Sequence, residues 1–236
     1  MRPTMNDRVG IAVFAKAPIE GLAKTRLIPY LGASGAADLQ RAMIENTLAK
    51  ALTSNIGPVS LWCAPDCRHE LFAVLAANYG IELHPQAGAN LGSRMFNAFD
   101  ILTPHYPVIL IGTDCPVLTP LNLIESANLL SEGSDVVFLP TEDGGYALIG
   151  ASKAWPEIFA DIRWGTDRVM AETRLRARAL GLLTAEPAIV WDIDTPADYD
   201  RAAGSGLLDF TSARRLPSIA PDADRDKFHE VGHDKP

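Results

Sequence analysis

The stretch Val108-Ile109-Leu110-Ile111-Gly112-Thr113-Asp114-Cys115-Pro116 contains the most strand-like segment of the chain. Its four consecutive aliphatic residues predict a strand that is buried on both faces, as in a parallel sheet covered by helices. The strand ends at Gly112, and the carboxylate of Asp114 follows almost at once. Ligands of open α/β sheets bind beyond the carboxyl ends of the strands. We therefore expect this stretch to lead from the sheet core into a ligand site.

Similar apolar runs alternate with helical patterns along the chain. The runs predict strands at 9–15, 58–63, 81–84, 108–111, 135–139, 146–149 and 189–193. Helical spacing predicts helices at 34–52, 66–79, 91–102 and 166–180, with two more beginning near 119 and 195. This alternation predicts a single α/β domain with a mostly parallel central sheet and helices on both faces. The domain is expected to span residues 1–210, and the polar residues 211–236 are expected to form a mobile tail.

Composition narrows the class of protein. The 236 residues carry a formal net charge of −8, which argues against a nucleic-acid partner. Three cysteines are too few for a disulfide scaffold, and the longest early apolar run is too short for a signal or membrane segment. We therefore expect a cytoplasmic protein with no membrane partner. An anionic ligand would have to be held by a local basic cluster.

The loop after the first strand is such a cluster. Lys16, Lys24 and Arg26 place three cations within eleven residues, and Gly21 would let a ligand approach the backbone. The loop does not match a P-loop, because Pro18 stands where that motif needs its first glycine. The loop is a candidate phosphate site. The alternative is a solvated basic loop.

A second glycine-rich loop follows the third predicted strand. Residues 86–95 lead into a helix, with Gly92 and Arg94 in its first turn. A helix N-terminus after such a loop is a natural anion or nucleobase site. Arg94 opposes the helix dipole there, so a stabilising role does not explain it. The alternative is a simple turn with a surface arginine.

Three aspartates are candidate ligands of a divalent cation. Asp114 follows the most apolar strand, and Asp192 and Asp194 lie on one side of the last predicted strand. Hard cations such as Mg²⁺ or Mn²⁺ take carboxylate oxygens and bridge to phosphates. Either Asp192 or Asp194 could be the second ligand. The alternatives are that Asp114 caps its turn and that Asp194 supports the turn into the next helix.

The stretch Asp143-Gly144-Gly145-Tyr146 joins two strand-like runs, so it could be no more than a hairpin turn. A functional role would place Asp143 near the substrate, as a base or as an acceptor of a hydroxyl hydrogen bond. Further along, Trp164 is either a core residue, which we favour, or a stacking platform, and Thr166 is a predicted helix N-cap.

Taken in order, these motifs resemble one family. They are Phe14-Ala15-Lys16-Ala17-Pro18, Gly21-x-x-Lys24-Thr25-Arg26-Leu27, Leu91-Gly92-x-Arg94-Met95, Gly112-Thr113-Asp114-Cys115-Pro116, Asp143-Gly144-Gly145-Tyr146, Trp164-x-Thr166 and Asp192-x-Asp194-Thr195-Pro196. The chain resembles the bacterial DUF2064 family of proposed glycosyltransferases, some of them labelled as arsenosugar-biosynthesis glycosyltransferases, over about residues 8–205. The resemblance implies the nucleotide-diphospho-sugar transferase (GT-A) fold. The first loop is also similar to that of phospholactate guanylyltransferases.

The resemblance also implies roles for residues. It implies that Lys16, Gly21, Lys24 and Arg26 line a nucleotide site, that Asp114 is the metal aspartate and that the Asp143 loop lies near the acceptor. The chain departs from the family pattern at Ser93, where an acidic residue is common, and at Gly165, where serine is common.

The leading hypothesis is a metal-dependent glycosyltransferase that uses a nucleotide-diphospho-sugar, a small-molecule acceptor and Mg²⁺ or Mn²⁺. One alternative is a nucleotidyltransferase that joins a nucleoside triphosphate to a phosphorylated small molecule, and another is a non-catalytic nucleotide-binding module. Asp143 is the candidate catalytic residue. The predicted nucleotide-binding residues are Lys16, Pro18, Gly21, Lys24, Arg26, Gly92, Arg94 and Thr113. The predicted acceptor-binding residues are Gly144, Gly145, Tyr146, Trp164 and Thr166, and the predicted metal ligands are Asp114, Asp192 and Asp194.

Overall fold

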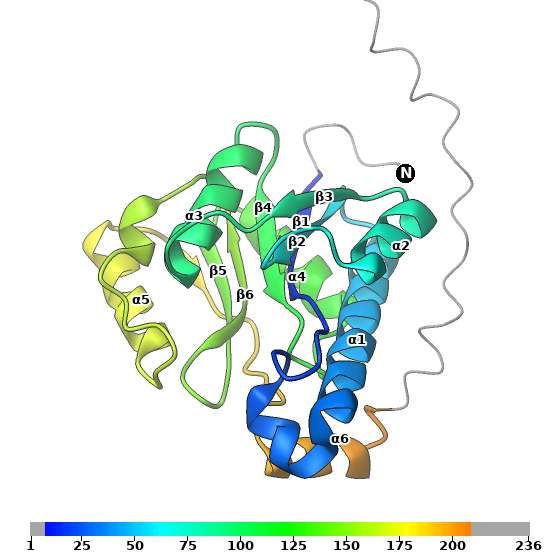
Figure 1. Ribbon diagram of the computed structural model, residues 1–236. Helices are drawn as coiled ribbons and strands as arrows, with labels where there is room; N and C mark the ends of the chain where they lie inside the picture. Colours follow the sequence, from blue (N-terminus) through cyan, green and yellow to red (C-terminus); the bar gives the residue numbers. More distant parts are fainter. Residues whose placement is uncertain (1–7, 209–236) are drawn as a thin grey trace, which may run out of the picture.

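The computed structural model describes residues 8–208, which form one α/β domain around a seven-stranded sheet (Figure 1). The strands are β1 (Gly10–Lys16), β2 (Val59–Ala64), β3 (Glu82–Pro85), β4 (Val108–Gly112), β5 (Val136–Pro140), β6 (Tyr146–Ala151) and β7 (Thr184–Ala185). Their order is β3-β2-β1-β4-β6-β5-β7, and only β6 runs antiparallel to its neighbours. The predicted fold class is confirmed. The predicted tail, residues 211–236, lies outside the described residues.

Helices cover both faces of the sheet. They are α1 (Ile28–Ser54), α2 (Glu70–Tyr79), α3 (Leu91–Leu102), α4 (Pro120–Ser131), α5 (Val169–Ala179) and α6 (Pro196–Gly204), with short 3₁₀ helices at Thr25–Leu27 and Pro156–Phe159. Alternate residues of β1 point into the two hydrophobic cores on opposite faces of the sheet. Ile11 and Val13 pack with α1, α2 and α4, whereas Ala12 and Phe14 pack with α3 and α5. None of the described helices is both long and apolar enough to cross a membrane.

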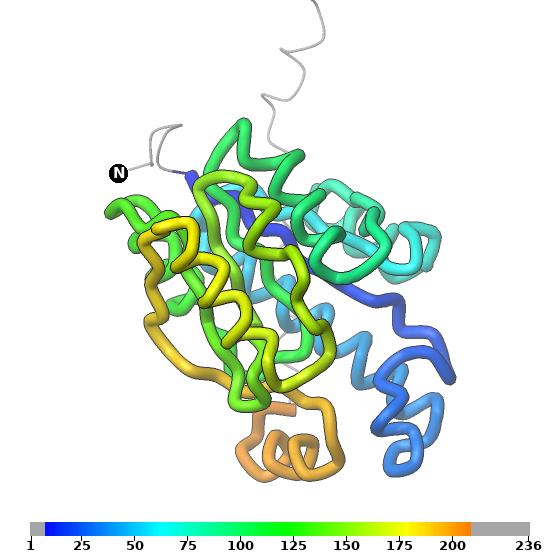
Figure 2. Tube along the Cα trace, turned by 90° about the vertical axis from the view of Figure 1, so that its left-hand side faces the viewer, coloured from blue at the N-terminus to red at the C-terminus, as the bar shows by residue number. Residues whose placement is uncertain are grey.

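The order of the strands determines where a ligand can bind. From β1 the chain builds outward through β2 and β3, and it then returns to add β4 on the other side of β1. A crevice forms at such a switch point, beyond the carboxyl ends of the two diverging strands. The loop after β1 and the turn after β4 both emerge there. α6 and the start of α1 lie at the same end of the molecule (Figure 2), where the Tyr30 hydroxyl donates to the Asp200 carboxylate at 2.8 Å.

The predicted last strand at 189–193 is wrong. This segment makes one isolated bridge, between Val190 and Thr141, and the strand that pairs with β5 is the earlier β7. The segment leaves the sheet because Trp191 and Ile193 are buried in a third apolar cluster with α1 and α6. Asp192 and Asp194 are therefore carried by an irregular segment, so the predicted alternation along a strand does not orient them.

Three predicted helix starts also differ. α1 begins at Ile28 rather than at 34, and Gly32 interrupts it with a left-handed φ of 73°. α2 begins only after His69, whose ring nitrogen accepts from the backbone N–H of Leu71. The predicted N-cap role of Thr166 is wrong, because α5 begins three residues later. The Thr166 hydroxyl instead closes the preceding turn by donating to the carbonyl of Arg163.

Candidate active site

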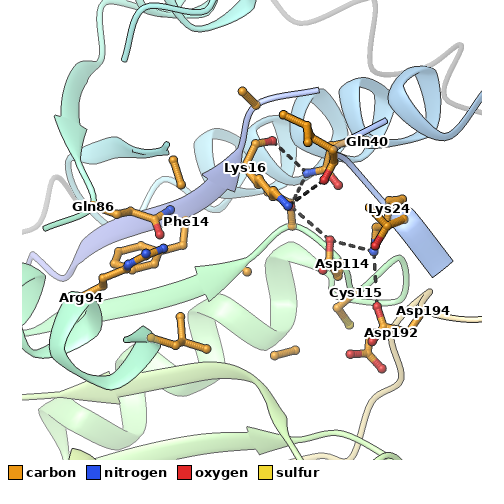
Figure 3. Close-up of a pocket in the computed structure, with 18 of the residues that line it drawn as sticks. Phe14, Lys16, Lys24, Gln40, Gln86, Arg94, Asp114, Cys115, Asp192 and Asp194 are labelled. Atoms are coloured by element: carbon orange, nitrogen blue, oxygen red, sulfur yellow. Dashed lines mark hydrogen bonds and ion pairs between the residues drawn. The ribbon is translucent and has the colours of Figure 1, made fainter. Parts of the chain in front are cut away.

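A cavity of about 880 Å³ opens at the switch point between β1 and β4. Its walls come from the first loop, the turn after β4, the loop before α3 and the segment that carries Asp192 (Figure 3). The sequence-predicted site residues that line it are Lys16, Lys24, Arg26, Arg94, Thr113, Asp114, Tyr146, Asp192 and Asp194. Residues from six of the seven motifs therefore meet around one space.

Lys24 is the most strongly held of the cations in this cavity. Only 6% of its side chain is exposed, and its ammonium lies 3.0 Å from an oxygen of Asp114 and 3.7 Å from an oxygen of Asp194. It also donates to the carbonyl of Ile193 at 2.6 Å. The Lys24 backbone is left-handed, with a φ of 45°, a conformation that costs a non-glycine residue about 1–2 kcal/mol. The loop adopts this unfavourable conformation at the residue whose ammonium lies between two carboxylates.

The other two cations of the first loop are more accessible. Arg26 donates to Asp194 at 3.1 Å with 71% of its side chain exposed. The Lys16 ammonium donates to the carbonyl of Leu22 at 2.7 Å, and it has no carboxylate partner among the described residues. Both side chains can therefore turn toward an anion at little cost.

Three carboxylates form what we call the acidic trio: Asp143, Asp192 and Asp194, each of which offers an oxygen within 4.8 Å of the other two. Burial, with the charges of Asp143, Asp194 and Asp114, raises the pKa of Asp192 to about 7. Convergent carboxylate oxygens suit a hard divalent cation, which would relieve their mutual repulsion. The trio therefore fits Mg²⁺ or Mn²⁺. Asp114 lies outside this group, and its metal role remains a prediction.

Asp143 belongs to the trio but not to the lining of the cavity. It lies in the β5–β6 turn, so the hairpin interpretation of this stretch is correct. One oxygen of Asp143 accepts from the Thr141 hydroxyl at 2.5 Å and from the backbone N–H of Gly145 at 2.9 Å. The turn thus fixes the carboxylate, and no hydrogen bond to its second oxygen is found among the described residues.

The far end of the cavity combines apolar walls with two polar side chains. Phe14 and Leu91 supply apolar surface. The Gln86 amide nitrogen donates to the carbonyls of Ala15 at 3.4 Å and Trp62 at 2.9 Å, which leaves its oxygen as an acceptor. Half-buried Arg94 donates through Nε to the carbonyl of Gly88 at 3.2 Å and has no carboxylate partner in the described part of the chain.

Several predicted site residues lie outside the cavity lining. These residues are Pro18, Gly21, Gly92, Gly144, Gly145, Trp164 and Thr166. Trp164 packs against the core that contains α3, as favoured from the sequence, and its ring lies where a Cβ on Gly92 would be, 2.6 Å from the nearest ring atom. Gly92 therefore serves close packing. Tyr146 lines the cavity, but its hydroxyl is buried. A ligand in the cavity could therefore contact the ring of Tyr146 but not its hydroxyl.

Sequence reasoning missed Gln40 and Gln86. Gln40 lies in α1 and is 4% exposed, and its amide donates to the Lys16 carbonyl and to the Thr113 hydroxyl, both at 3.3 Å. It joins the ends of β1 and β4 at the switch point. The sequence did contain a signal for Gln40, because this polar residue falls on the apolar face of the helix predicted at 34–52. Gln86 lies at the start of the glycine-rich loop that was predicted as an anion or nucleobase site. No role was predicted for its own side chain.

Comparison with known proteins gives the family. The sequence profile described as "Uncharacterized protein conserved in bacteria (DUF2064)" matches residues 47–166, just over half of the chain. The chain belongs to the DUF2064 family. The match includes the Gly92–Arg94 loop, Asp114 and the Asp143 turn. No curated protein sequence matches this DUF2064 member significantly.

Solved structures agree on the fold. This DUF2064 member is similar to a protein from Desulfovibrio desulfuricans G20 that is provisionally named a nucleotide-diphospho-sugar transferase, with 28% identity, a TM-score of 0.77 and coverage of 91% of this chain and 93% of that one. It shares its fold with 4-diphosphocytidyl-2C-methyl-D-erythritol synthase from Anaerococcus prevotii DSM 20548, at 12% identity, a TM-score of 0.56 and coverage of 85% and 99%. At such low identity the second likeness shows the fold alone.

Proposed function

We propose that this protein is a metal-dependent glycosyltransferase that takes a sugar from a nucleotide-diphospho-sugar. The observation that carries the proposal is that Lys24 and Arg26 meet Asp194 at the rim of one cavity. Cations beside carboxylates are what a diphosphate with a divalent ion requires. The provisional name of the Desulfovibrio relative supports the same class of donor.

The cations of the first loop would act on the phosphates. The exposed side chains of Lys16 and Arg26 could exchange their present partners for phosphate oxygens, and Lys24 holds a fixed charge beside them. Fixed cations stabilise the charge that develops on a departing nucleoside diphosphate. A divalent ion held by Asp143, Asp192 and Asp194, when bound, would add further positive charge at the leaving group.

The two ends of the cavity would bind different parts of the substrates. The nucleobase would bind at the far end, between the apolar side chains of Phe14 and Leu91. The Gln86 amide oxygen would accept a hydrogen bond from its polar edge, and the Arg94 guanidinium would donate one. The turn from Asp143 to Tyr146 would receive the acceptor. The second oxygen of Asp143 is the candidate base for the acceptor hydroxyl where Asp192 and Asp194 hold the ion without it.

Nucleotidyl transfer is the second candidate. Lys16 favours it, because this cation has no carboxylate partner among the described residues and could bind the third phosphate of a nucleoside triphosphate. The Anaerococcus structure has the same fold, which suits either reaction.

A ligand screen would test the proposal. Thermal melting should be measured with nucleoside mono-, di- and triphosphates and with nucleotide sugars, each with Mn²⁺ or with a chelator. A ligand at 100 times its dissociation constant should add about 2.7 kcal/mol of stability. Release of a nucleoside diphosphate from a nucleotide sugar would support glycosyl transfer, and release of pyrophosphate from a triphosphate would support nucleotidyl transfer. If no nucleotide raises the melting temperature with or without metal, both proposals fail.

A further inference from the structure

Arg201, in α6, contacts the two chain segments that carry most of the acidic trio. Its guanidinium donates to both carboxylate oxygens of Glu142, at 2.7 and 3.1 Å. The same group lies 4.2 Å from the centroid of the Trp191 ring. Glu142 directly precedes Asp143 in the chain, and Trp191 directly precedes Asp192. One side chain therefore joins the flanks of two members of the trio.

Few other contacts fix these segments to each other. The backbone N–H of Val190 donates to the carbonyl of Pro140 at 2.9 Å, and that of Glu142 donates to the carbonyl of Val190 at 3.0 Å. Among the described residues, strand pairing between the segments consists of the single Thr141–Val190 bridge. The aspartates that follow repel one another. A contact just outside the trio would add to these bonds in opposing the separation of the aspartates.

The contact uses properties that arginine has and lysine lacks. The planar guanidinium forms two parallel hydrogen bonds to one carboxylate and stacks on an aromatic ring with the same atoms. Glu142 and Trp191 are thereby held on two sides of one rigid group.

We propose that Arg201 is a positioning residue that sets the separation of Asp143 and Asp192 and, through it, the affinity of the acidic trio for a divalent cation. This inference rests on the proposed function, because it requires the trio to hold the ion. Arg201 contacts neither the trio carboxylates nor the cavity lining in the contacts described, so its effect passes through Glu142 and Trp191.

The chain offers a matched control for a purely structural role. Arg174, in α5, donates to both oxygens of Glu186 at 2.7 Å, and 36% of its side chain is exposed, against 48% for Arg201. Arg174→Gln removes the same charge and the same kind of ion pair, but it leaves Glu142 and Trp191 untouched. Exposed ion pairs of this kind contribute little to stability, so neither Gln variant should unfold.

The test is the dissociation constant of Mn²⁺ for the full chain, from the electron paramagnetic resonance signal of free Mn²⁺. Arg201→Gln should weaken Mn²⁺ binding about tenfold, as residues that orient metal ligands do. Arg201→Lys should weaken it less, and Arg174→Gln should leave it unchanged. Glu142→Gln should reproduce the loss, and the Glu142→Gln/Arg201→Gln pair should add nothing further.

Each outcome decides the inference. Equal Mn²⁺ affinity in the parent and in Arg201→Gln would overturn the positioning role and leave the metal site standing. If Arg174→Gln weakened Mn²⁺ binding as much as Arg201→Gln does, the effect would be one of net charge, and the positioning role would be overturned as well. Absence of Mn²⁺ binding by the parent would overturn the metal site and this role together. If Arg201→Gln fails to fold, Arg201→Lys and Glu142→Gln carry the test.

Discussion

The Lys24 ammonium lies 3.0 Å from the carboxylate of Asp114, so the loop after β1 is joined by charge to the turn after β4. Two aspartates that meet at one sheet edge need a neutralising cation, and the sequence alone suggested a divalent ion for Asp114 and Asp194. Lys24 lies between these two carboxylates. A metal at Asp114 would have to share that carboxylate with Lys24 or displace its ammonium.

Removing the Lys24 charge should cost both stability and nucleotide affinity. Lys24→Ala should lower the free energy of unfolding by about 1–3 kcal/mol, because it leaves Asp114 without its cation and Asp194 with Arg26 alone. The value stays below that of a fully buried pair because the Asp114 side chain is 46% exposed. Lys24→Gly should be less destabilising than Lys24→Ala, because glycine accepts the left-handed backbone without cost. Urea denaturation of both variants measures the difference, and equal values would show that the loop relaxes.

Arg26→Ala is the companion experiment for the first loop. Its ion pair is mostly exposed, so the free energy of unfolding should change by less than about 1 kcal/mol. Nucleotide binding should still weaken by about 1.5–3 kcal/mol, because a charge-assisted bond to phosphate is lost. Calorimetry at fixed salt measures this loss. If both Arg26→Ala and Lys24→Ala bound nucleotide as tightly as the parent, the loop would be a solvated basic surface and not a phosphate site.

The pKa of Asp192 predicts how stability varies with pH. Burial and three neighbouring carboxylates raise the pKa to about 7 from the model-compound value of 3.8, so the folded protein binds this proton more tightly than the unfolded chain. The stabilising contribution is complete below about pH 4 and is lost as the pH rises to about 7. Asp192→Asn stays neutral, so it should gain stability relative to the parent between these limits.

This comparison requires a chelator, since a bound cation would favour the charged carboxylate. The control for the loss of one carboxylate elsewhere is Asp100→Asn, at an exposed residue of α3 that does not line the cavity. A difference between Asp192→Asn and the parent that does not vary with pH would show that the carboxylate is charged throughout.

Close packing at Gly92 gives a prediction about the first turn of α3. A Cβ on this residue would lie 2.6 Å from the Trp164 ring, so Gly92→Ala must displace the ring or the helix. We expect a loss of about 1–3 kcal/mol, as for other overpacked sites. Gly112→Ala is the control, because in residues 8–208 no atom outside its two chain neighbours lies within 4 Å of an added Cβ. Thermal melting of the two variants should separate them, and equal melting temperatures would show that Trp164 moves freely.

The fold was largely predictable because the strand signals are strong. The run from Val108 to Ile111 is apolar throughout, and burial on both faces of a covered sheet explains it. The error at 189–193 has the same origin, since Trp191 and Ile193 are buried but pack on α1 and α6 rather than in the sheet. An apolar pattern predicts burial, whereas the partner that provides it depends on tertiary structure.

The site was predictable as a set of loops but not as a set of contacts. The rule that ligands bind at strand ends brought Lys24, Asp114 and Asp194 to one edge. Spacing in the sequence could not show that Lys24 neutralises the other two, nor that Asp143 joins Asp192 in the trio. It also could not show that Arg201 in α6 reaches Glu142, because these contacts depend on how loops far apart in the chain pack together.

The identity of the metal ligands gives the last prediction. If the acidic trio holds the divalent ion at the rim of the nucleotide cavity, Mn²⁺ and a nucleoside diphosphate should bind with positive coupling of about 1–3 kcal/mol. Asp192→Asn should abolish this coupling, because its carboxylate belongs to both the trio and the cavity lining. Asp114→Asn should retain most of it, because Asp114 pairs with Lys24 instead. Calorimetric titration of the diphosphate with and without Mn²⁺ measures the coupling in each variant. The reverse result, with coupling lost in Asp114→Asn and kept in Asp192→Asn, would establish Asp114 as the metal aspartate and require Lys24 to give up its place beside that carboxylate.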